Sequence, residues 1–298
     1  MSFDPIEFLE AAVRADSTSD VAAARDLLLD VLREAGHDPR VDATGNVRVS
    51  RGAGSPHLVF NTHLDTVSPH VGFERDGDIV RGRGACDAKG PLTALVDAFL
   101  DAEIEEGTLT LAVTPDEELL STGAHALMTG EVAPGGPGEA GARVDPLAAA
   151  GPAPDAFVVG EPTGLDVCTA ARGRFEGTIS IEGTAAHAAS PESGVNAVSV
   201  AGCALDALES FDNVAAHSQL GEATLVPTAI DGGESTNQVP AGCTITVDRR
   251  SVPPETAEGF RRALEAQLRR SIGADPSVSV SLIARETQFL AAFATDPG

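Results

Sequence analysis

The chain contains no tryptophan and no tyrosine, and Lys89 is the single lysine among its 20 basic residues. Without those aromatic residues only phenylalanine could stack on a sugar ring or a base, so a carbohydrate or base platform is not expected. The 45 acidic residues bring the net charge to −25, which would repel the phosphates of nucleic acid. An acidic surface nearly free of lysine is typical of a halophilic protein from a salt-loaded cytoplasm. An ordinary acidic cytosolic enzyme is the alternative.

Cysteine pairs and long apolar runs are also missing. The four cysteines (Cys86, Cys168, Cys203, Cys243) include no CxxC pair, and we interpret them as small buried apolar residues in a reducing cytosol. No N-terminal signal is present, and no apolar run of about 18 residues could span a bilayer. We therefore expect a soluble cytoplasmic protein without membrane partners. Its 298 residues, 42% of them apolar, are enough for about two domains.

Short apolar runs alternate with helical segments in residues 1–167. Asp4-Pro5 opens a first helix, and a second is expected from about residue 19 to 34. Strands are expected at 47–50, 57–61, 108–114 and 155–160, the last of them buried. This order predicts an α/β domain whose mostly parallel sheet has helices on both faces. Residues 132–154, rich in glycine, proline and alanine, are expected to form a flexible surface loop without chemistry of its own.

The pattern changes after about residue 167. Four amphipathic strands, RFEGTISIEG, ATLVPTAIDGG, TITVDRRSV and SVSVSLIA, are separated by helices at about 194–210 and 255–271. This order predicts a small α+β domain with one open sheet and both helices on one face. We expect it to span residues 168–285, inserted in or appended to the first domain.

Side chains that bind metals follow the apolar runs of the first half. They are His63 and Asp65 in VFNTHLDTV, Asp87 in RGRGACDAKG, Glu117 and Glu118 in TPDEE, and Glu161 in VVGEPTG. Residues that follow the strands of an α/β sheet share one crevice. Imidazole and carboxylate ligands without thiolates favour a catalytic site for zinc, cobalt or manganese.

Each of these residues has an ordinary role as well. Asp65 could accept the second ring N–H of His63 and fix the tautomer of a metal-binding imidazole. Asp87 could bridge two cations or could cap the helix that follows it. Of Glu117 and Glu118, one could bind a metal while the other acts as a general base on water, although such a pair is usually a solvated turn. The combination indicates hydrolytic metal chemistry.

In the same order, NTHLDTV, GRGACDAKG, TPDEE and GEPTG resemble the motifs of the zinc-dependent amidohydrolase and metallopeptidase family. That family includes acetylornithine deacetylase, succinyl-diaminopimelate desuccinylase, aminoacylase and glutamate carboxypeptidase. The resemblance covers nearly the whole chain and implies a catalytic domain of the zinc-exopeptidase type. It implies that His63 and Glu161 bind one divalent metal ion, that Glu118 binds a second, and that Asp87 bridges both.

The same resemblance implies the remaining roles in the first domain. Glu117 is the general base, Asp65 orients the imidazole, and the peptide between Asp87 and Ala88 is cis. The second domain then resembles the family's ferredoxin-like lid and dimerisation domain, which makes a homodimer the expected assembly.

Three lid residues are expected to reach the substrate. His187 matches a histidine that enters the active site of a partner subunit and helps to polarise the scissile carbonyl. Asn237 and Arg250 are the expected contacts to a substrate carboxylate or carbonyl. Strand alternation separates Arg250 from the adjacent Arg249 but leaves open which of the two is exposed.

The chain departs from the family pattern at its end. The resemblance implies a further stretch of catalytic domain with a histidine that joins Glu118, whereas the last histidine here is His217, inside the lid. We interpret residues 286–298 as the start of the return to the catalytic domain and the chain as C-terminally truncated. A short functional variant that borrows His70 or His125 is the alternative. Missing strands and helices would leave apolar surface bare on the first domain.

The predicted function is metal-dependent hydrolysis of the amide bond of N-acyl amino acids in amino-acid biosynthesis. N-Succinyl-diaminopimelate and N-acetylornithine are the expected types of substrate, with a slight preference for the first. Two divalent metal ions are expected, zinc foremost, with the second site one histidine short. The alternatives are a truncated homologue that only dimerises, and a dipeptidase or aminopeptidase of the same family.

Overall fold

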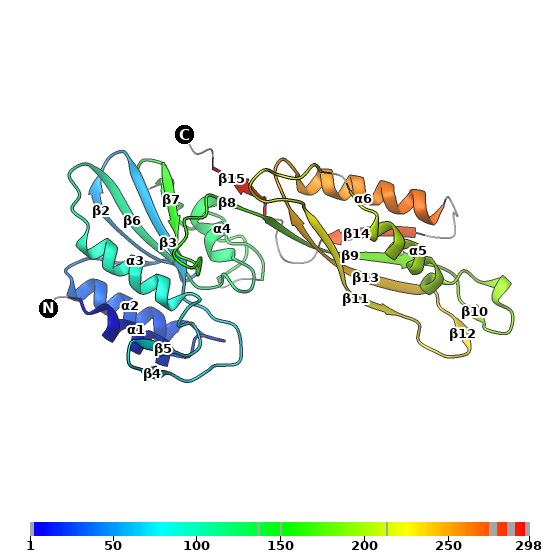
Figure 1. Ribbon diagram of the computed structural model, residues 1–298, viewed down its shortest axis with the longest axis horizontal. Coiled ribbons are helices and arrows are strands. Elements are labelled where there is room, and N and C mark those ends of the chain that lie inside the picture. Colours follow the sequence, from blue (N-terminus) through cyan, green and yellow to red (C-terminus); the bar gives the residue numbers. More distant parts are fainter. Residues whose placement is uncertain are drawn as a thin grey trace. The chain divides into compact units, whose positions relative to one another are not determined.

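The computed structural model describes residues 3–135, 138–149, 151–212, 214–273, 279–284 and 290–295. The chain divides into two compact units, Met1–Asp166 and Val167–Gly298 (Figure 1). Among the described residues, no helix has the length and apolar character needed to cross a membrane.

Unit 1 is built on a five-stranded sheet. Its order is β1 (Arg40–Val41), β2 (Val47–Ala53), β6 (Gly107–Thr114), β3 (His57–His63) and β7 (Ala156–Val159). The predicted α/β fold is confirmed, but the sheet is mixed. β6, β3 and β7 are parallel, whereas β1 and β2 run antiparallel to their neighbours. Parallel pairing needs a long crossover, which α3 provides between β3 and β6, whereas the short link 54–56 reverses the chain between β2 and β3.

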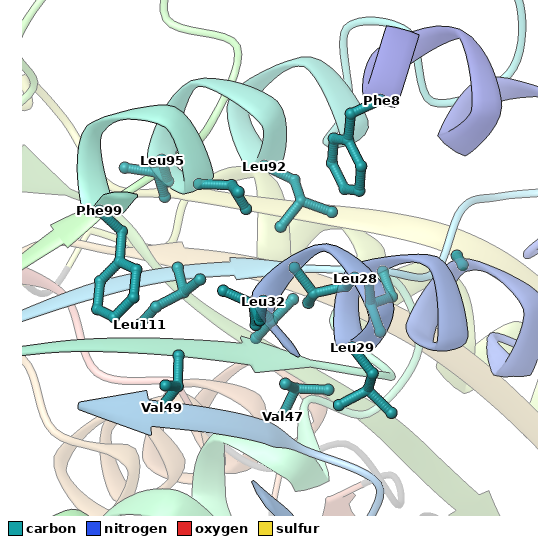
Figure 2. Packing of buried hydrophobic residues seen from close by; sticks show 14 of the residues in the cluster. Phe8, Leu28, Leu29, Leu32, Val47, Val49, Leu92, Leu95, Phe99 and Leu111 are labelled. Atoms are coloured by element: carbon teal, nitrogen blue, oxygen red, sulfur yellow. The ribbon is translucent and has the colours of Figure 1, made fainter. Parts of the chain in front are cut away.

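Three helices, α1 (Pro5–Arg14), α2 (Ala22–Glu34) and α3 (Lys89–Asp101), pack through the main apolar core of unit 1. Figure 2 shows Leu28 and Leu32 of α2 and Phe99 of α3 directed toward Leu111 of β6. As predicted, Asp4 caps α1, because its Oδ1 accepts the amides of Ile6 and Glu7 at 2.9 and 3.1 Å.

A second, smaller cluster contains the side chains of β3 and β6 that alternate away from this core. Val59 and Ala112 pack there against Leu127 of α4 (Thr122–Thr129) and Leu147 of the helical turn Leu147–Ala149. The prediction of a loose loop at 132–154 therefore needs correction for its described residues. Few of its side chains are both large and apolar, but Val132 and Leu147 are buried, so the segment folds back onto the domain.

Two further predictions about burial are wrong. β7 is not a buried strand, since Phe157, Val158 and Val159 are 43%, 44% and 54% exposed. Among the described residues β7 forms one edge of the sheet and pairs with β3 alone, so apolar surface is exposed at this edge. Of the cysteines only Cys243 is buried, while Cys86, Cys168 and Cys203 are exposed. An isolated cysteine carries no periodic signal that would predict its burial.

Unit 2 is one open antiparallel sheet with two helices, as predicted. The sheet order is β11 (Thr224–Gly232), β13 (Gly242–Ser251), β9 (Gly173–Glu182) and β14 (Ser279–Ala284). Alternate residues of β9, including Ile179 and Ile181, are buried against α5 (Ala197–Glu209) and α6 (Ala257–Ile272), which lie on the same face (Figure 1). Two short ribbons complete the unit: β10 (Ala186–His187) with β12 (Gln238–Val239), and β8 (Ala170–Ala171) with β15 (Phe293–Ala294).

Residues 286–298, expected to begin a return to the first domain, are described only at 290–295. Leu290 bridges to Arg174, and β15 pairs with β8, so this described part lies on unit 2. The backbone hydrogen bonds of these residues are formed with the start of the lid.

Candidate metal centre

The predicted site residues of unit 1 follow the carboxyl ends of three parallel strands. His63 is the last residue of β3, Glu117 and Glu118 come shortly after β6, and Glu161 comes two residues after β7. The apolar runs form the adjacent parallel strands β6, β3 and β7, and the chain leaves each of these strands at the same end of the sheet. Loops after parallel strands form the usual ligand-binding crevice of such a sheet. The buried Thr62 joins two of the strand ends, because its hydroxyl donates to the Gly160 carbonyl at 2.9 Å.

Three side chains converge here closely enough to hold one cation. The ligand atoms of His63, Asp87 and Glu161 all lie within 4.8 Å of one another. His63 Nε2 is 3.2 Å from Asp87 Oδ1 and 3.8 Å from Glu161 Oε1. One imidazole and two carboxylates form a donor set that suits Zn²⁺ or a similar divalent ion in a catalytic site. The residues present therefore fit a divalent metal ion.

Asp65 lies behind the imidazole and is itself buried. His63 Nδ1 is 3.0 Å from the Asp65 carbonyl oxygen and 3.2 Å from its Oδ1. A proton on Nδ1 satisfies both acceptors, which leaves the lone pair of Nε2 for a metal. The same carboxylate accepts the backbone amides of Glu117 and Glu118 at 3.0 and 2.9 Å. Asp65 therefore connects the imidazole with the segment that carries both glutamates.

Asp87 precedes α3 without capping it. The residue at the cap position is Ala88, and no side-chain hydrogen bond caps the helix. The peptide between Asp87 and Ala88 is cis, as predicted. Lys89 is buried, and its ammonium donates to the Ala15 carbonyl at 2.7 Å. The Asp87 carboxylate, half-exposed and directed at His63, is thus available as a ligand.

The charges of the site are unbalanced without a cation. Burial by itself lowers the pKa of His63, but its hydrogen bond to Asp65 and the nearby carboxylates raise that pKa to about 9. Burial, helped by repulsion from Glu117 and Asp87, raises the pKa of Glu161 to about 7 although His63 opposes the shift. Burial and the charge of Asp87 also raise the pKa of Glu118. Carboxylates crowded in this way are stabilised by a bound cation.

A second metal position would use Asp87 and Glu118. In the part of the chain that the structure describes, His63–Asp87–Glu161 is the one group of three converging ligands, and it does not include Glu118. His70 Nδ1 lies 3.8 Å from Asp16 instead, and His125 is located on α4. Among the described residues, neither histidine joins a metal-binding group.

Two of the predicted lid residues lie together in unit 2. His187 on β10 is exposed and pairs with Gln238 of β12, and the Ala188 amide donates to the Asn237 carbonyl at 2.9 Å. The Asn237 side chain accepts from Ser235 Oγ at 2.7 Å. The ribbon of β10 and β12 therefore places His187 and Asn237, the residue just before β12, close together in unit 2.

The structure distinguishes the two adjacent arginines of β13. Arg249 is only 2% exposed and forms a two-pronged ion pair with Glu255, at 2.9 Å from Nε and 2.8 Å from Nη2. Its guanidinium also lies over the rings of Phe211 and Phe260. The Arg250 side chain is 46% exposed, and its Nε donates to Asp248 at 2.9 Å. Only Arg250 can therefore meet a ligand, at a position eight residues along β13 from the end next to β12.

The chain is similar to known proteins over most of its length. A family model described as the peptidase dimerisation domain matches residues 169–275. A putative LysW-lysine/LysW-ornithine hydrolase of Pyrobaculum aerophilum is 33% identical over 274 residues, covering 91% of this chain and 73% of the relative. A succinyl-diaminopimelate desuccinylase of Cereibacter sphaeroides is 31% identical over 323 residues, covering all of this chain and 80% of the relative. The chain belongs to the M20 peptidase family.

The fold of this M20 protein matches as well. A solved M20 family metallo-carboxypeptidase from Sulfolobus solfataricus is similar with a TM-score of 0.68, at 13% identity, over 99% of this chain and 80% of that one. The predicted family, fold class and enzyme class are confirmed: the chain is a hydrolase of amide bonds. Membership implies divalent metal ions, and the cluster around His63 is chemically suited to hold one.

One more residue of this region, Asp116, was not among the predicted site residues. It precedes Glu117 and is buried, with hydrogen bonds to Thr122 and Gly123. Its position directly before two glutamates could have indicated a role in the site. Its hydrogen bonds to Thr122 and Gly123, six and seven residues later, cannot be predicted from a local sequence pattern.

Proposed function

We propose that this protein removes the acyl group from an N-acyl amino acid by metal-dependent hydrolysis of the amide bond in the cytoplasm. The observation that carries the proposal is the convergence of His63, Asp87 and Glu161 within 4.8 Å at the strand ends, next to Glu117. Deacylation of an amino acid is also what the name of the Cereibacter relative describes. N-Succinyl-diaminopimelate is the preferred candidate, and N-acetylornithine is the second.

The chain's residues divide the chemical work. A divalent ion held by His63, Asp87 and Glu161 supplies Lewis acidity at the scissile carbonyl. Asp65 accepts a hydrogen bond from Nδ1 of His63, so Nε2 is the nitrogen that would bind the ion. Glu117 takes a proton from the attacking water as its oxygen bonds to the carbonyl carbon. The carbon–nitrogen bond then breaks, and Glu117 returns the proton to the leaving amine.

The lid supplies recognition in this proposal. Arg250 is exposed and carries a planar guanidinium suited to a substrate carboxylate. Asn237 can donate to a carbonyl or carboxylate oxygen, and His187 of a partner subunit polarises the scissile carbonyl. A substrate that carries both an amino-acid carboxylate and an acyl carboxylate, as a succinylated amino acid does, would use these groups most fully.

A homodimer is the proposed assembly, in line with the dimerisation domain matched by unit 2. In the part of unit 2 that the structure describes, β11 lies at an edge of the sheet and pairs with β13 alone, and Val226 and Ile230 of β11 are 49% and 54% exposed. An open apolar edge of this kind is suited to a strand from a second copy of the chain.

Zinc is the proposed metal, with one tight site and a second, weaker one. His63, Asp87 and Glu161 make up the tight site, whereas among the described residues the second rests on the carboxylates of Asp87 and Glu118. That difference also keeps a second function open, a chain that dimerises but does not turn over substrate. A dipeptidase or aminopeptidase activity uses the same chemistry and is separated from deacylation by a substrate panel.

The deciding experiment replaces Glu117 with alanine. We expect turnover of N-acyl amino acids to disappear while the zinc content, measured by atomic emission, stays within about a quarter of the wild-type value, because a base need not be a ligand. Loss of zinc in parallel with activity would remove Glu117 from the proposed role. A wild-type protein that binds zinc and dimerises, but hydrolyses no member of the panel, would establish the non-catalytic alternative.

A further inference from the structure

The loop that carries Glu117 and Glu118 is closed by the residue just before them. Asp116 is 6% exposed, and its Oδ2 accepts the Thr122 amide at 2.8 Å and also the Thr122 hydroxyl. Its Oδ1 accepts the Gly123 amide at 2.8 Å, and its carbonyl accepts the Ser121 amide at 2.8 Å. Hydrogen bonds from three successive residues therefore tie residues 116–123 into a ring.

These bonds replace a helix cap that α4 would otherwise lack. Ser121 occupies the cap position with a left-handed backbone (φ 52°), and its side chain forms no capping hydrogen bond. The Asp116 carboxylate instead binds the free amides at the start of the helix, where negative charge is favoured. Charge-assisted bonds of this kind are about twice as strong as neutral ones.

The backbone of Glu117 is held by hydrogen bonds at both its amide and its carbonyl. Its amide donates to Asp65 Oδ1 at 3.0 Å, and its carbonyl accepts from Ser121 Oγ at 3.1 Å. The Glu118 amide donates to Asp65 Oδ2 at 2.9 Å. Asp65 thus fixes the segment toward the imidazole, while Asp116 fixes it toward α4. The backbone of Glu117 and Glu118 therefore lies between the segment bound by Asp65 and the loop closed by Asp116.

The ring is also packed tightly at Gly123. A Cβ atom added there would lie 2.5 Å from Asn46 Oδ1, 2.7 Å from Pro115 Cδ and 2.9 Å from Asp116 Oδ1. The Gly123 carbonyl accepts from Asn46 Nδ2 at 3.0 Å, which joins the ring to the turn between β1 and β2. With no room around it, the ring has little freedom to change shape.

We propose that Asp116 is a positioning residue that sets the place of Glu117 and Glu118 relative to the His63 site. This inference rests on the roles proposed for the two glutamates and extends them to the residue that aims both. A general base must lie within hydrogen-bond reach of the proton it removes, so a small displacement of the ring lowers turnover. His63 ends β3, and Asp87 and Glu161 belong to other loops. The acceptors that orient the imidazole, the carbonyl and carboxylate of Asp65, lie outside the ring of residues 116–123.

The test compares Asp116→Asn with Asp4→Asn, a matched control in which another helix-capping carboxylate is replaced far along the chain. In Asp116→Asn we expect the amides of Glu117 and Glu118 to exchange with deuterium about tenfold faster or more, because loop opening becomes easier. The Kd for one equivalent of Co²⁺ stays within about twofold, and kcat falls about 10–100-fold with KM within about threefold. In Asp4→Asn only the amides near Ile6 and Glu7 lose protection.

Faster exchange confined to Thr122 and Gly123, with Glu117 and Glu118 as in the wild type, would overturn the proposal and leave Asp116 as a cap for α4. If Asp116→Asn does not fold, Thr122→Val removes the hydroxyl donor while keeping the amide. We expect it to speed exchange at Glu117 and Glu118 in the same direction, and no change there overturns the proposal. Exchange needs no substrate, so a protein without deacylase activity would defeat the proposed function while this test still decides the positioning.

Discussion

Asp65 Oδ1 lies 3.2 Å from His63 Nδ1, with only Leu64 between the two residues in the sequence. The same carboxylate binds the amides of Glu117 and Glu118, so one side chain orients both a ligand and the loop that carries the base. Removing one of its two oxygens therefore affects metal binding and turnover together.

For Asp65→Asn we expect the Zn²⁺ affinity of the tight site to fall about 10–100-fold, as replacement of the partner of a ligating histidine usually does. Competition with a chelator of known affinity measures the change. Asp42→Asn is the control, since Asp42 also accepts several hydrogen bonds, from Thr44 and Asn46, but none from the site. Equal Zn²⁺ affinity in Asp65→Asn and Asp42→Asn would contradict the orienting role.

Metal binding should release protons in a way that depends on pH. Without metal the pKa of His63 is about 9 and that of Glu161 about 7, and both groups must lose their protons to bind a cation. At pH 7.5 His63 is protonated and Glu161 partly so, and we expect release of about one proton per zinc. Apparent affinity then rises with pH up to about 9 and levels off above it. Calorimetry in buffers of different ionisation enthalpy counts the protons, and constant affinity from pH 6 to 9 would contradict the expectation.

Alanine substitutions of the two arginines of β13 should have different effects, one on stability and the other on KM. Arg249→Ala removes the cation that forms the two-pronged ion pair with the buried Glu255, and we expect a loss of about 3–5 kcal/mol in the free energy of unfolding, measured with urea. Arg250→Ala changes stability by less than about 1 kcal/mol, because its ion pair is exposed. It raises KM instead for substrates with a free carboxylate.

The double variant Arg249→Met/Glu255→Met tests whether a buried charge causes the loss of stability in Arg249→Ala. It removes both buried charges and should recover most of the lost stability. A destabilisation by Arg250→Ala as large as that by Arg249→Ala would show that both arginines are structural.

Chemical modification of the single lysine, Lys89, can be used to detect unfolding. Burial lowers the pKa of Lys89 to about 8, so an accessible amine would react readily at pH 8, but the residue is only 1% exposed. We expect an amine-reactive ester to leave the Lys89 peptide unmodified in the folded protein and to modify it fully in urea, as mass spectrometry would detect. Rapid modification of the folded chain would show that the contact with Ala15 opens easily.

Much of the site could be predicted from sequence because His63, the two adjacent glutamates and Glu161 lie at or shortly after the ends of short apolar runs. His63 and Glu161 are recognised by local motifs, and parallel strands bring those motifs together. Exposure was harder to predict. The run AFVV gives no sign that β7 is an edge, and alternation places Arg249 and Arg250 on opposite faces without saying which face the helices cover. Asp116 has partners that only the folded loop brings near.

The exposed edge of β7 limits the conditions under which this protein can be handled. At low ionic strength a net charge of −25 opposes the approach of one β7 edge to another. At about 1 M salt charges are screened beyond about 3 Å, and that barrier to strand pairing disappears. The same salt that relieves repulsion within the acidic chain therefore removes the protection of Phe157 and Val159 against aggregation.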